Sequence, residues 1–450
     1  MVLALLMFCS PAQAASDAPW WESLSDPALA SMVEQGLQNN PSVQSQQWLA
    51  EDARAQAQRA RAALLPTLSA DASWNYAPTD SLGFGLGIDT TALAGPPDPS
   101  QPVEEKPTLY GSGSVGLNAG WNLDVFGTNA HTWRAGVEDT RMREHDADAV
   151  ALSTARAISD AYYDVVLAEL QLAVVREQRD SNTLLLGLVE EQYAGGAVGS
   201  LDVLQQRQLM ASAEASVPQY ESILVPAQQR LSTLLGEAPD APIGSVATGL
   251  PEIGPLEEVG LGAQPALASA EAASRSAAHR KSSAVGAMLP TLRITANAGV
   301  QGFDLGELDT QSIYGFGGSV SIPLFDGGLR VSSVRSAQRT QRARDLSVQS
   351  TRLDLEQRLA SARFRDAKSA EQLSAARMQR DAAVAARDEA QSQYLAGLAG
   401  HAQLVNAITA AQSAELAALR THRDRVGARL DLIQAAGGDW TRTLANGEIR

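Results

Sequence analysis

The chain has 450 residues, of which 44% are hydrophobic, 19% charged and 5% aromatic, and its formal net charge is −16. This length allows a large core or one elongated unit, and the excess of acids argues against nucleic acid or anionic lipid as the main binding partner. The aromatic content is low for a compact enzyme.

The first residues are typical of an export signal. An apolar run over Val2–Phe8 precedes Ala12-Gln13-Ala14, a small-x-small cleavage site, so we expect a signal peptide over residues 1–14. The single cysteine, Cys9, lies inside that segment, and the mature chain would therefore have no disulfide and no thiol chemistry. The alternative is a lipid anchor at Cys9, which would need a small residue before it, whereas Phe8 stands there. No later apolar run reaches the roughly 18 residues that a transmembrane helix needs.

Two motifs occur twice in the same order along the chain. Leu65-Pro66-Thr67-Leu68 returns as Leu289-Pro290-Thr291-Leu292, 224 residues later. Gln192-Tyr193-Ala194-Gly195-Gly196 returns as Gln393-Tyr394-Leu395-Ala396-Gly397, 201 residues later. The chain is therefore internally duplicated, and each copy should contain the same elements in the same order.

Four segments alternate apolar and polar residues, two in each copy. Their apolar faces are Leu68, Ala70, Ala72, Trp74 and Tyr76; Val115, Leu117, Ala119, Trp121 and Leu123; Leu292, Ile294, Ala296, Ala298 and Val300; and Phe316, Val320, Ile322 and Leu324. Segments of about 9 to 11 residues cross a bilayer as tilted strands, with lipid on one side and water on the other. A soluble β-sandwich alternates in the same way, but four strands make a poor sandwich. Four strands are also too few to close a barrel, so we expect three chains to share one of 12 strands.

Long helices are expected after each strand pair. Residues 129–193 contain no proline and would extend roughly 97 Å as a helix, and residues 331–394 repeat the pattern. Apolar residues keep a heptad-like spacing along both: Ala151, Ala155, Ile158, Tyr162, Val165 and Leu172, with Leu167, Leu170 and Val174 on a neighbouring face; and Leu346, Leu353, Leu355, Leu359 and Leu373. Each helix ends in a glycine-marked turn, and a return helix follows to about Leu235 or Ala436. Two helical hairpins with exposed tips are predicted.

These elements give a predicted domain organisation. It comprises a helical part over 15–66, a strand pair over 67–124, a hairpin over 125–236, a linker over 237–264, a helix over 265–290, a strand pair over 291–324, a hairpin over 325–436 and a tail over 437–450. The first copy has 25 more residues between its strands than the second, and they must fall within residues 77–110, where Gly and Pro clusters break regular structure. We expect this insertion to form a loop that faces the cell exterior.

Six ordered motifs carry a family resemblance. They are Trp20–Leu29 (WWESLSDPAL), Gln38–Pro41 (QNNP), Ala62–Pro66 (AALLP), Trp121–Gly127 (WNLDVFG), Pro323–Gly328 (PLFDGG) and Gly437–Trp440 (GGDW). Together they resemble the outer-membrane efflux factors, above all the TolC-like channels of the NodT type, over nearly the whole mature chain. The resemblance implies a membrane β-barrel plus an α-helical barrel: a homotrimer in the cell outer membrane, with a long periplasmic extension closed at its tips. It also implies two partners, a periplasmic adaptor and an inner-membrane transporter of the RND type.

The same resemblance implies a pore gate just past the second tip. In the family a Tyr there is followed, nine and twelve residues later, by positions that often hold Asp; here the three residues are Tyr394, Gln403 and Asn406. Neutral amides at both positions remove a ring of carboxylates that would favour cations. Asp202, the first-copy counterpart of Gln403, keeps its charge, although Ser200 and an acid at a helix start are also ordinary capping residues.

By resemblance, the tip turns would dock against the adaptor's helical hairpin. These adaptor-facing residues are Gly195, Gly196, Ala197, Gly199, Ala396, Gly397, Leu398 and Gly400. For Gly196 and Gly397, which match the family glycine, the alternative role is simply to end a helix.

No catalytic motif emerges from the sequence. The five histidines, His131, His145, His279, His401 and His422, include no pair at the i, i+4 spacing of a helical metal site, and there is no nucleophile elbow. We therefore expect no enzyme, no cofactor, no metal and no nucleic acid, but a passive exit duct for drugs or other small toxic compounds, in contact with outer-membrane lipid. A type I protein-secretion duct is the alternative channel. A periplasmic coiled-coil scaffold or adaptor is disfavoured, because such chains lack paired strands of barrel length.

Overall fold

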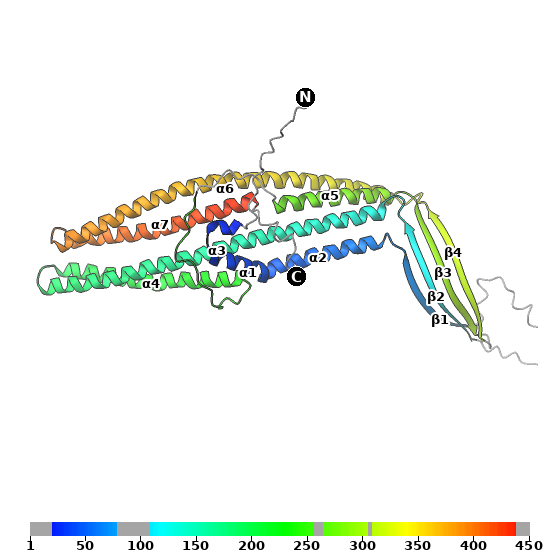
Figure 1. The fold of residues 1–450 in the computed structure, drawn as a ribbon, viewed down its shortest axis with the longest axis horizontal. Coiled ribbons are helices and arrows are strands. Elements are labelled where there is room, and N and C mark those ends of the chain that lie inside the picture. The colour runs from blue at the N-terminus through cyan, green and yellow to red at the C-terminus, as the bar shows by residue number, and fades with distance from the viewer. Residues whose placement is uncertain (1–19, 79–108, 255–263, 305–307, 438–450) are drawn as a thin grey trace, which may run out of the picture. The chain divides into compact units, whose positions relative to one another are not determined.

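The computed structural model describes residues 20–78, 109–254, 264–304 and 308–437. In chain order the elements are the 3-10 helix η1 (Trp20–Leu24), α1 (Pro27–Asn39), α2 (Pro41–Ala62), β1 (Thr67–Pro78), β2 (Leu109–Leu123), α3 (Thr128–Ala194), α4 (Ser200–Leu234), α5 (Pro265–Gly286), β3 (Thr291–Asp304), β4 (Leu308–Ser321), α6 (Leu329–Leu395) and α7 (His401–Ala436). Each copy thus runs helix, strand, strand, long helix, return helix (Figure 1). The expected signal peptide, most of the outer loop and most of the tail lie outside the described residues.

The elements divide into two units. The strand unit comprises residues 53–139 and 274–343, and the helical unit comprises residues 1–52, 140–273 and 344–450. Among the described helices of both units, none contains a stretch apolar and long enough to cross a membrane.

The strand unit contains one antiparallel sheet in the order β1-β2-β3-β4. Its register aligns Leu68, Ala119, Ala296 and Phe316 in one row, and Ala70, Leu117, Ala298 and Tyr314 in another. The opposite face carries the row Ser69, Asn118, Asn297 and Gly315. Tyr314 and Phe316 are 89% and 84% exposed, so the apolar face is uncovered within the chain. The predicted alternation of an apolar and a polar face is confirmed.

The fourth strand differs from its predicted position. Apolar positions extend the pattern to Leu324, but β4 ends at Ser321 and begins earlier, at Leu308. Pro323 explains the end, because proline has no N–H to donate to a strand ladder. Ile322 and Leu324 therefore lie beyond the strand, in the connection to α6, and their side chains are exposed.

A glycine in β2 leaves space for a pair of aromatic side chains on β1. Trp74 pairs with Gly113, and a Cβ at that glycine would collide with the indole ring. Tyr76 contacts Trp74 edge to face, with ring centroids 5.8 Å apart. Amphipathic aromatic rings of this kind are typical of the level where a membrane meets water.

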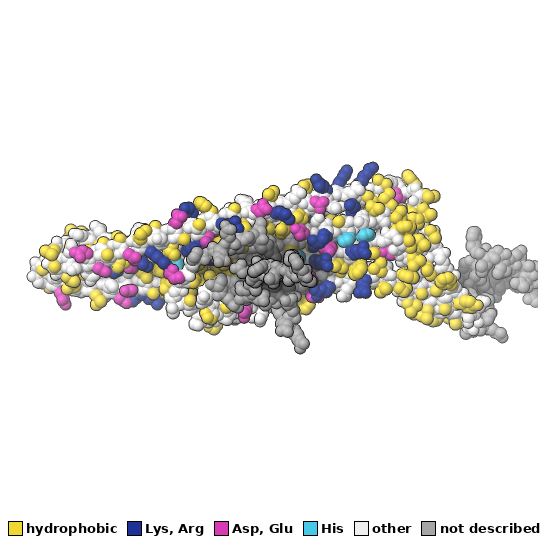
Figure 2. Space-filling view, turned by 45° about the horizontal axis from the view of Figure 1, so that its top comes forward, with side chains coloured by type: hydrophobic (Ala, Val, Ile, Leu, Met, Phe, Trp, Pro, Cys, Tyr) yellow, Lys and Arg dark blue, Asp and Glu magenta, His cyan; other side chains and the backbone are white. Residues whose placement is uncertain are grey.

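A belt of basic residues lies on the helical segments that adjoin the strands. These segments, residues 53–62, 128–139, 274–286 and 329–343, carry eleven basic residues against the two acids Glu138 and Asp139. The basic residues, named here the basic collar, are Arg54, Arg59, Arg61, Arg134, Arg275, Arg280, Lys281, Arg330, Arg335, Arg339 and Arg342. Figure 2 shows Lys and Arg gathered beside the hydrophobic surface of the strands. The net charge of −16 therefore conceals a strongly cationic zone.

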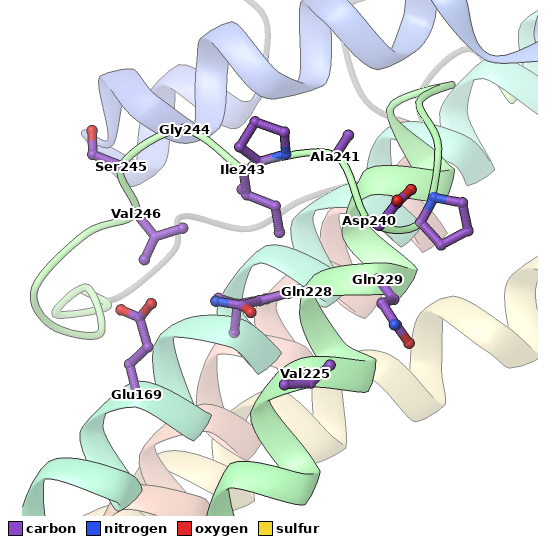
Figure 3. Close-up of a pocket in the computed structure, with 13 residues that line it drawn as sticks. Glu169, Val225, Gln228, Gln229, Asp240, Ala241, Ile243, Gly244, Ser245 and Val246 are labelled. Carbon is purple, nitrogen blue, oxygen red and sulfur yellow. The ribbon is translucent and has the colours of Figure 1, made fainter.

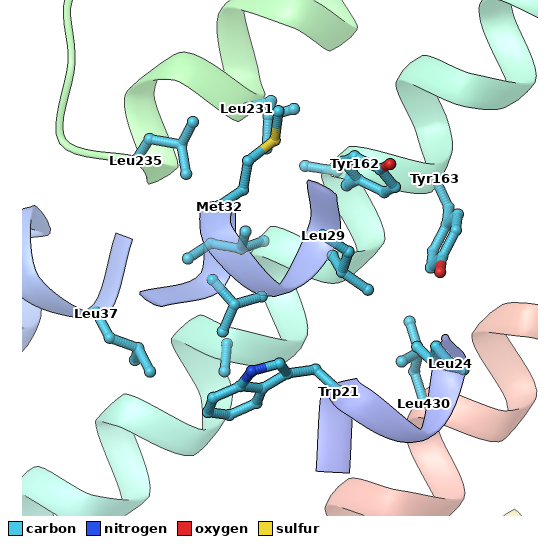
Figure 4. Packing of buried hydrophobic residues seen from close by; sticks show 14 of the residues in the cluster. Trp21, Leu24, Leu29, Met32, Leu37, Tyr162, Tyr163, Leu231, Leu235 and Leu430 are labelled. Atoms are coloured by element: carbon cyan, nitrogen blue, oxygen red, sulfur yellow. The ribbon is translucent and has the colours of Figure 1, made fainter. Parts of the chain in front are cut away.

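The helical unit contains two antiparallel hairpins, α3 with α4 and α6 with α7 (Figure 1). Its main core gathers η1, α1 and the middle of α3, where Trp21, Leu29 and Tyr162 are buried together (Figure 4). The heptad-spaced residues predicted on the first long helix, Ala151, Ala155, Ile158, Tyr162, Val165 and Leu172, are all buried. The backbone N–H of Ala247 donates a 2.8 Å hydrogen bond to the Tyr162 hydroxyl and fixes the segment after α4 over this core.

The second long helix is buried less than its pattern predicts. Leu355, Leu359 and Leu373 are buried, but Leu346 and Leu353 are 50% and 66% exposed. Phe364 and Met378, both 65% exposed, continue the same side of α6, since residues 7, 11 and 14 positions apart share one helical face. We call Leu346, Leu353, Phe364 and Met378 the apolar stripe. It is an apolar seam with no partner among the described residues of its own chain.

Buried charge joins α6 to α7. Asp366 accepts hydrogen bonds from Arg425 at 2.5 Å and from Arg429 at 2.9 Å, and both arginines are 5% exposed. Arg425 also donates to Ser369 Oγ at 3.2 Å, and Arg429 to the carbonyl of Gly254 at 2.8 Å. Two buried cations thus depend on one carboxylate and its neighbouring oxygen atoms.

The segment after α4 also borders a groove of about 660 Å³ (Figure 3). Its walls come from Glu169 on α3, from Gln228 and Gln229 on α4, and from the chain at residues 239–246. Glu169 and Asp240 are the titratable residues of this lining, and apolar side chains of Val, Ile and Pro make up the larger part of the rest. The groove offers no set of groups suited to catalysis.

Candidate functional site

The two hairpin tips in the helical unit have the same backbone geometry. In the first tip Gly196 has φ +72°, and the N–H of Ala197 donates to the carbonyl of Gln192 at 2.8 Å. In the second, Gly397 has φ +71°, and the N–H of Leu398 donates to the carbonyl of Gln393 at 2.8 Å. A left-handed glycine followed by this bond is the Schellman ending of a helix. Both glycines therefore have a structural role, whatever they bind.

The return helices begin differently in the two copies. Asp202, at the third position of α4, accepts a 3.0 Å hydrogen bond from the N–H of Gly199 and so caps the helix. Its carboxylate also lies where the partial positive charge of the helix start stabilises it. At the corresponding place in α7, Gln403 follows the N-cap Gly400 without a charge. The capping role expected as the alternative for Asp202 is thus present in the structure.

Tyr394 joins the two tips. It is 6% exposed and packs with Val189, Val203, Ala390 and Leu404, in a cluster drawn from both hairpins. Its hydroxyl donates a 2.9 Å hydrogen bond to Gln192 Oε1 on α3. Burial raises the pKa of the Tyr394 phenol, and the Asp202 carboxylate raises it further. The phenol therefore stays neutral and remains a hydrogen-bond donor.

His401, the first residue of α7, is a further member of this cluster. It is 4% exposed, its ring lies 5.6 Å from that of Tyr394, and neither ring nitrogen has a hydrogen-bond partner among the described residues. Burial lowers the pKa of His401, while the nearby Asp202 carboxylate acts in the opposite direction. A neutral imidazole is thus enclosed where the two tips meet.

Gln403 and Asn406 lie outside this cluster. Both side chains are exposed, whereas Leu404 between them is fully buried in it. The remaining tip residues Gly195, Gly196, Ala197, Gly199, Ala396, Gly397, Leu398 and Gly400 are also exposed, and Leu398 is 81% exposed. The structure therefore brings together Tyr394 and Asp202, and leaves the two amides and the tip turns on the surface.

Sequence reasoning missed two features. The first is that Gln192 and His401 contact Tyr394 where the tips meet. The repeated Gln-Tyr pair was a signal for Gln192, because it places one Gln and one Tyr in each tip. His131 and His279, 148 residues apart, meet in the strand unit with Nδ1 atoms 3.4 Å apart. Burial lowers the pKa of His279, and His131 adds to the effect. Spacing along one helix does not reveal such a pair.

The sequence matches a known protein family over most of its length. The sequence profile of the family described as "Outer membrane efflux protein" matches residues 32–237 and 260–438. The chain belongs to that family. The pyoverdine export outer membrane protein OpmQ of Pseudomonas aeruginosa is 27% identical over 434 residues, which cover 94% of this chain and 87% of OpmQ. The toluene efflux pump outer membrane protein TtgC of Pseudomonas putida is 24% identical, over 95% of this chain and 86% of TtgC.

Among solved structures, the outer membrane protein VceC of Vibrio cholerae superposes with a TM-score of 0.80 at 21% identity, over 94% of this chain and 100% of VceC. The likeness confirms the fold class expected from the sequence: an internally duplicated protomer that combines strands of a membrane β-barrel with long helices of an α-helical barrel. As an outer membrane efflux protein, the chain is located in the outer membrane with a long periplasmic helical part. Its family and structural neighbours are channel proteins. Among the residues described, no group of three or more His, Cys, Asp or Glu side chains is arranged to hold a metal ion.

Proposed function

We propose that three copies of this outer membrane efflux protein form the exit duct of a tripartite pump. The duct is passive, and it carries drugs or other small toxic compounds from an inner-membrane transporter of the RND type, through a periplasmic adaptor, to the exterior. Relatives named for export of pyoverdine and of toluene support a cargo of small molecules. The observation that carries the proposal is the four-stranded sheet with one continuous exposed apolar face.

The two edge strands of this sheet need strands of neighbouring copies to pair with. Among the described strands, β1 and β4 pair on one side only, and unpaired strand edges are strongly disfavoured in lipid. Three chains with four strands each give a barrel of 12 strands. The apolar stripe of α6 supports the same arrangement. Trp48 and Leu49 on α2 are 74% and 43% exposed and offer apolar surface of the kind that such a stripe packs against.

The basic collar supports a particular placement in the membrane. The apolar face of the sheet faces lipid, and the collar lies at the level of the inner-leaflet headgroups, where anionic phospholipid attracts Lys and Arg. In this orientation residues 77–110 form the outer loop, and the helical hairpins extend into the periplasm. Residues 15–66 and 265–290 then lead into the strand pairs 67–124 and 291–324, and the hairpins 125–236 and 325–436 follow, joined by the linker 237–264.

The hairpin tips provide the gate and the adaptor contact. The Tyr394–Gln192 hydrogen bond holds the two tips of one chain together, with Asp202 close to Tyr394 as part of the gate, and Gln403 and Asn406 line the constriction that three chains form. The exposed tip turns, centred on Gly196 and Gly397, dock the adaptor. Small residues there let a helical hairpin approach the backbone closely.

Two measurements test the proposal. The purified protein in detergent should migrate as a trimer that dissociates on heating, and deletion of the gene should sensitise the cell to several small compounds. A monomer that stays soluble without detergent would overturn the channel. Cross-linking from a cysteine at Ala197 should capture an adaptor of an RND system; capture of a protein-secretion adaptor instead would favour the type I duct.

A further inference from the structure

Two histidines from distant parts of the sequence meet between α3 and α5. His131 lies near the start of α3 and His279 in the second half of α5. Their rings stack at 30° with centroids 5.6 Å apart, and their Nδ1 atoms approach to 3.4 Å. Both side chains are half-buried, and Figure 2 shows histidine at the surface among the basic side chains beside the strands.

Two polar contacts near this pair fix α5 against α3. Thr132 and Ser283 share a hydrogen bond of 2.9 Å, one helical position beyond His131. Further along α3, Asp139 receives a 2.6 Å hydrogen bond from the Ser276 hydroxyl. On α5 the two bonds lie on either side of His279, whereas on α3 both follow His131. They fix the packing of α5 against α3, so that the approach of the two rings is built into the helix packing.

We propose that His131 and His279 bind one divalent first-row transition-metal ion, of the kind represented by Cu²⁺ and Zn²⁺. Metal–nitrogen bonds of about 2.0–2.1 Å at a tetrahedral angle place two ligand nitrogens about 3.3–3.4 Å apart. The two Nδ1 atoms are separated by 3.4 Å, which matches this spacing. Imidazole nitrogen is a preferred ligand of copper, zinc and nickel, so the donor type agrees with the spacing.

The charges around the pair are mixed, since the Arg134 cation lowers the pKa of His279 and the Glu138 carboxylate raises it. Arg275 forms a 2.7 Å ion pair with Glu138, and Arg280 forms a 2.6 Å ion pair with Asp139, so these two collar arginines are neutralised. Glu138 is thereby engaged and does not serve as a third ligand. Because both histidines reach solvent, water molecules complete the coordination, as in an open rather than a closed site.

The site occurs once in each chain. The positions that match His131 and His279 in the other copy are Arg330 and Ala55, which cannot form it. Since α3 belongs to the first copy and α5 opens the second, a bound ion would cross-link the two copies beside the membrane. Metal that binds only the folded arrangement raises its stability by mass action.

The experiment uses the full mature protein, purified as a trimer in detergent and without a histidine tag. Cu²⁺ is added in steps and followed by electron paramagnetic resonance, and Zn²⁺ is followed by the midpoint of thermal unfolding. We expect one Cu²⁺ per chain, with superhyperfine splitting from two ligand nitrogens. Zn²⁺ should raise the midpoint of thermal unfolding. His131→Asn and His279→Asn should each weaken Cu²⁺ binding at least tenfold and abolish the rise.

His145→Asn is the matched control, because His145 also lies on α3 but pairs with Asp148, at 3.5 Å, and not with a second histidine among the described residues. It should bind Cu²⁺ as the wild type does. The proposal is overturned if both histidine variants retain wild-type Cu²⁺ affinity and spectrum, or if His145→Asn alone removes binding. Should either Asn variant fail to form trimers, the corresponding Gln variant, which keeps more of the side-chain volume, is measured under the same criteria.

Discussion

The Tyr394 hydroxyl donates a 2.9 Å hydrogen bond to Gln192 Oε1 and links the two hairpin tips of one chain. The duplicated positions do not repeat this bond. Tyr193, the counterpart of Tyr394, is 50% exposed, and Gln393, the counterpart of Gln192, donates to Glu389 on its own helix. The contact is therefore made by only one Tyr–Gln combination, and it holds the first hairpin against the second.

Tyr394→Phe should loosen the tips and favour the open channel. The ring and its packing are kept, while one hydrogen bond worth about 1 kcal/mol is lost, which corresponds to an open population about fivefold larger. We expect a higher mean conductance of the purified trimer in planar lipid bilayers. Tyr193→Phe removes an exposed hydroxyl at the matching position of the other copy and should leave conductance unchanged; equal effects of the two variants would contradict the linkage.

The tip should also respond to acid through His401. A free imidazole titrates near about 6.5, and burial lowers the pKa of His401 in the packed tip. The unpacked tip therefore binds the proton more tightly, so packing is fully stable above that pH and loses stability as the pH falls through it. Conductance should rise between pH 7.5 and pH 5.

His401→Phe tests whether this residue is responsible. Phenylalanine fills the same buried space beside Tyr394 and cannot be protonated, so the acid-dependent part of the conductance should vanish. The control is His422→Phe. His422 lies on α7 like His401, but its ring is hydrogen-bonded to the carbonyl of Pro251. This variant should retain the acid response. An unchanged acid response in His401→Phe would show that another group controls it.

The duplicated architecture was accessible from sequence, because it rests on periodicity and on repeated motifs. Period-two alternation marked the strands, and heptad spacing marked the buried side of α3. The predicted end of β4 was too late because Ile322 and Leu324 continue the apolar alternation, whereas Pro323 between them cannot donate to the strand ladder. Leu346 and Leu353 satisfy the helical pattern yet remain exposed, since periodicity identifies an apolar face but does not say which chain covers it.

The contacts at the tip and between the two histidines show a second limit of prediction from sequence. Asp202 could be identified as a capping residue from its position, because capping is local. The contacts of Tyr394 with Gln192, and of His131 with His279, depend on how helices from different copies pack. Net charge has a similar limit, because it averages the basic collar with acids elsewhere in the chain.

Asp366 should be the most sensitive buried charge for stability. Asp366→Asn leaves Arg425 and Arg429 buried without their counter-charge, and breaking a buried ion pair on one side costs about 3–5 kcal/mol. We expect a clearly lower midpoint of chemical unfolding for the variant trimer. Asp354→Asn, which removes an exposed partner of Arg358 on the same helix, should cost at most about 0.5 kcal/mol. Similar costs for the two variants would refute the special role of Asp366.

The basic collar should bind anionic lipid. Arg335, Arg339 and Arg342 are exposed on one side of α6, and each basic residue near an anionic membrane contributes about 1 kcal/mol. Reversing all three to Glu should reduce reconstitution into vesicles that contain phosphatidylglycerol, with little effect in purely zwitterionic vesicles. Added salt should weaken the wild-type preference for anionic vesicles.

A control for the collar comes from the same helix. Arg352, Arg358 and Arg363 lie further along α6, in the helical unit, and their reversal to Glu changes the total charge equally. That triple variant should keep the lipid preference of the wild type. If it loses the preference to the same extent, net charge and not the position of the collar is responsible.

The amides past the second tip should set ion selectivity. Gln403 and Asn406 are exposed on α7, so Gln403→Asp combined with Asn406→Asp would place six carboxylates around a trimeric constriction without disturbing the buried Leu404. Rings of carboxylates attract cations, and we expect the cation-to-anion permeability ratio in planar bilayers to rise severalfold and to fall again as acid protonates them. Ala410→Asp with Ser413→Asp adds the same charges to the same face of α7, two turns further along. If that pair changes selectivity as strongly as the first, the narrowest point does not lie at Gln403 and Asn406.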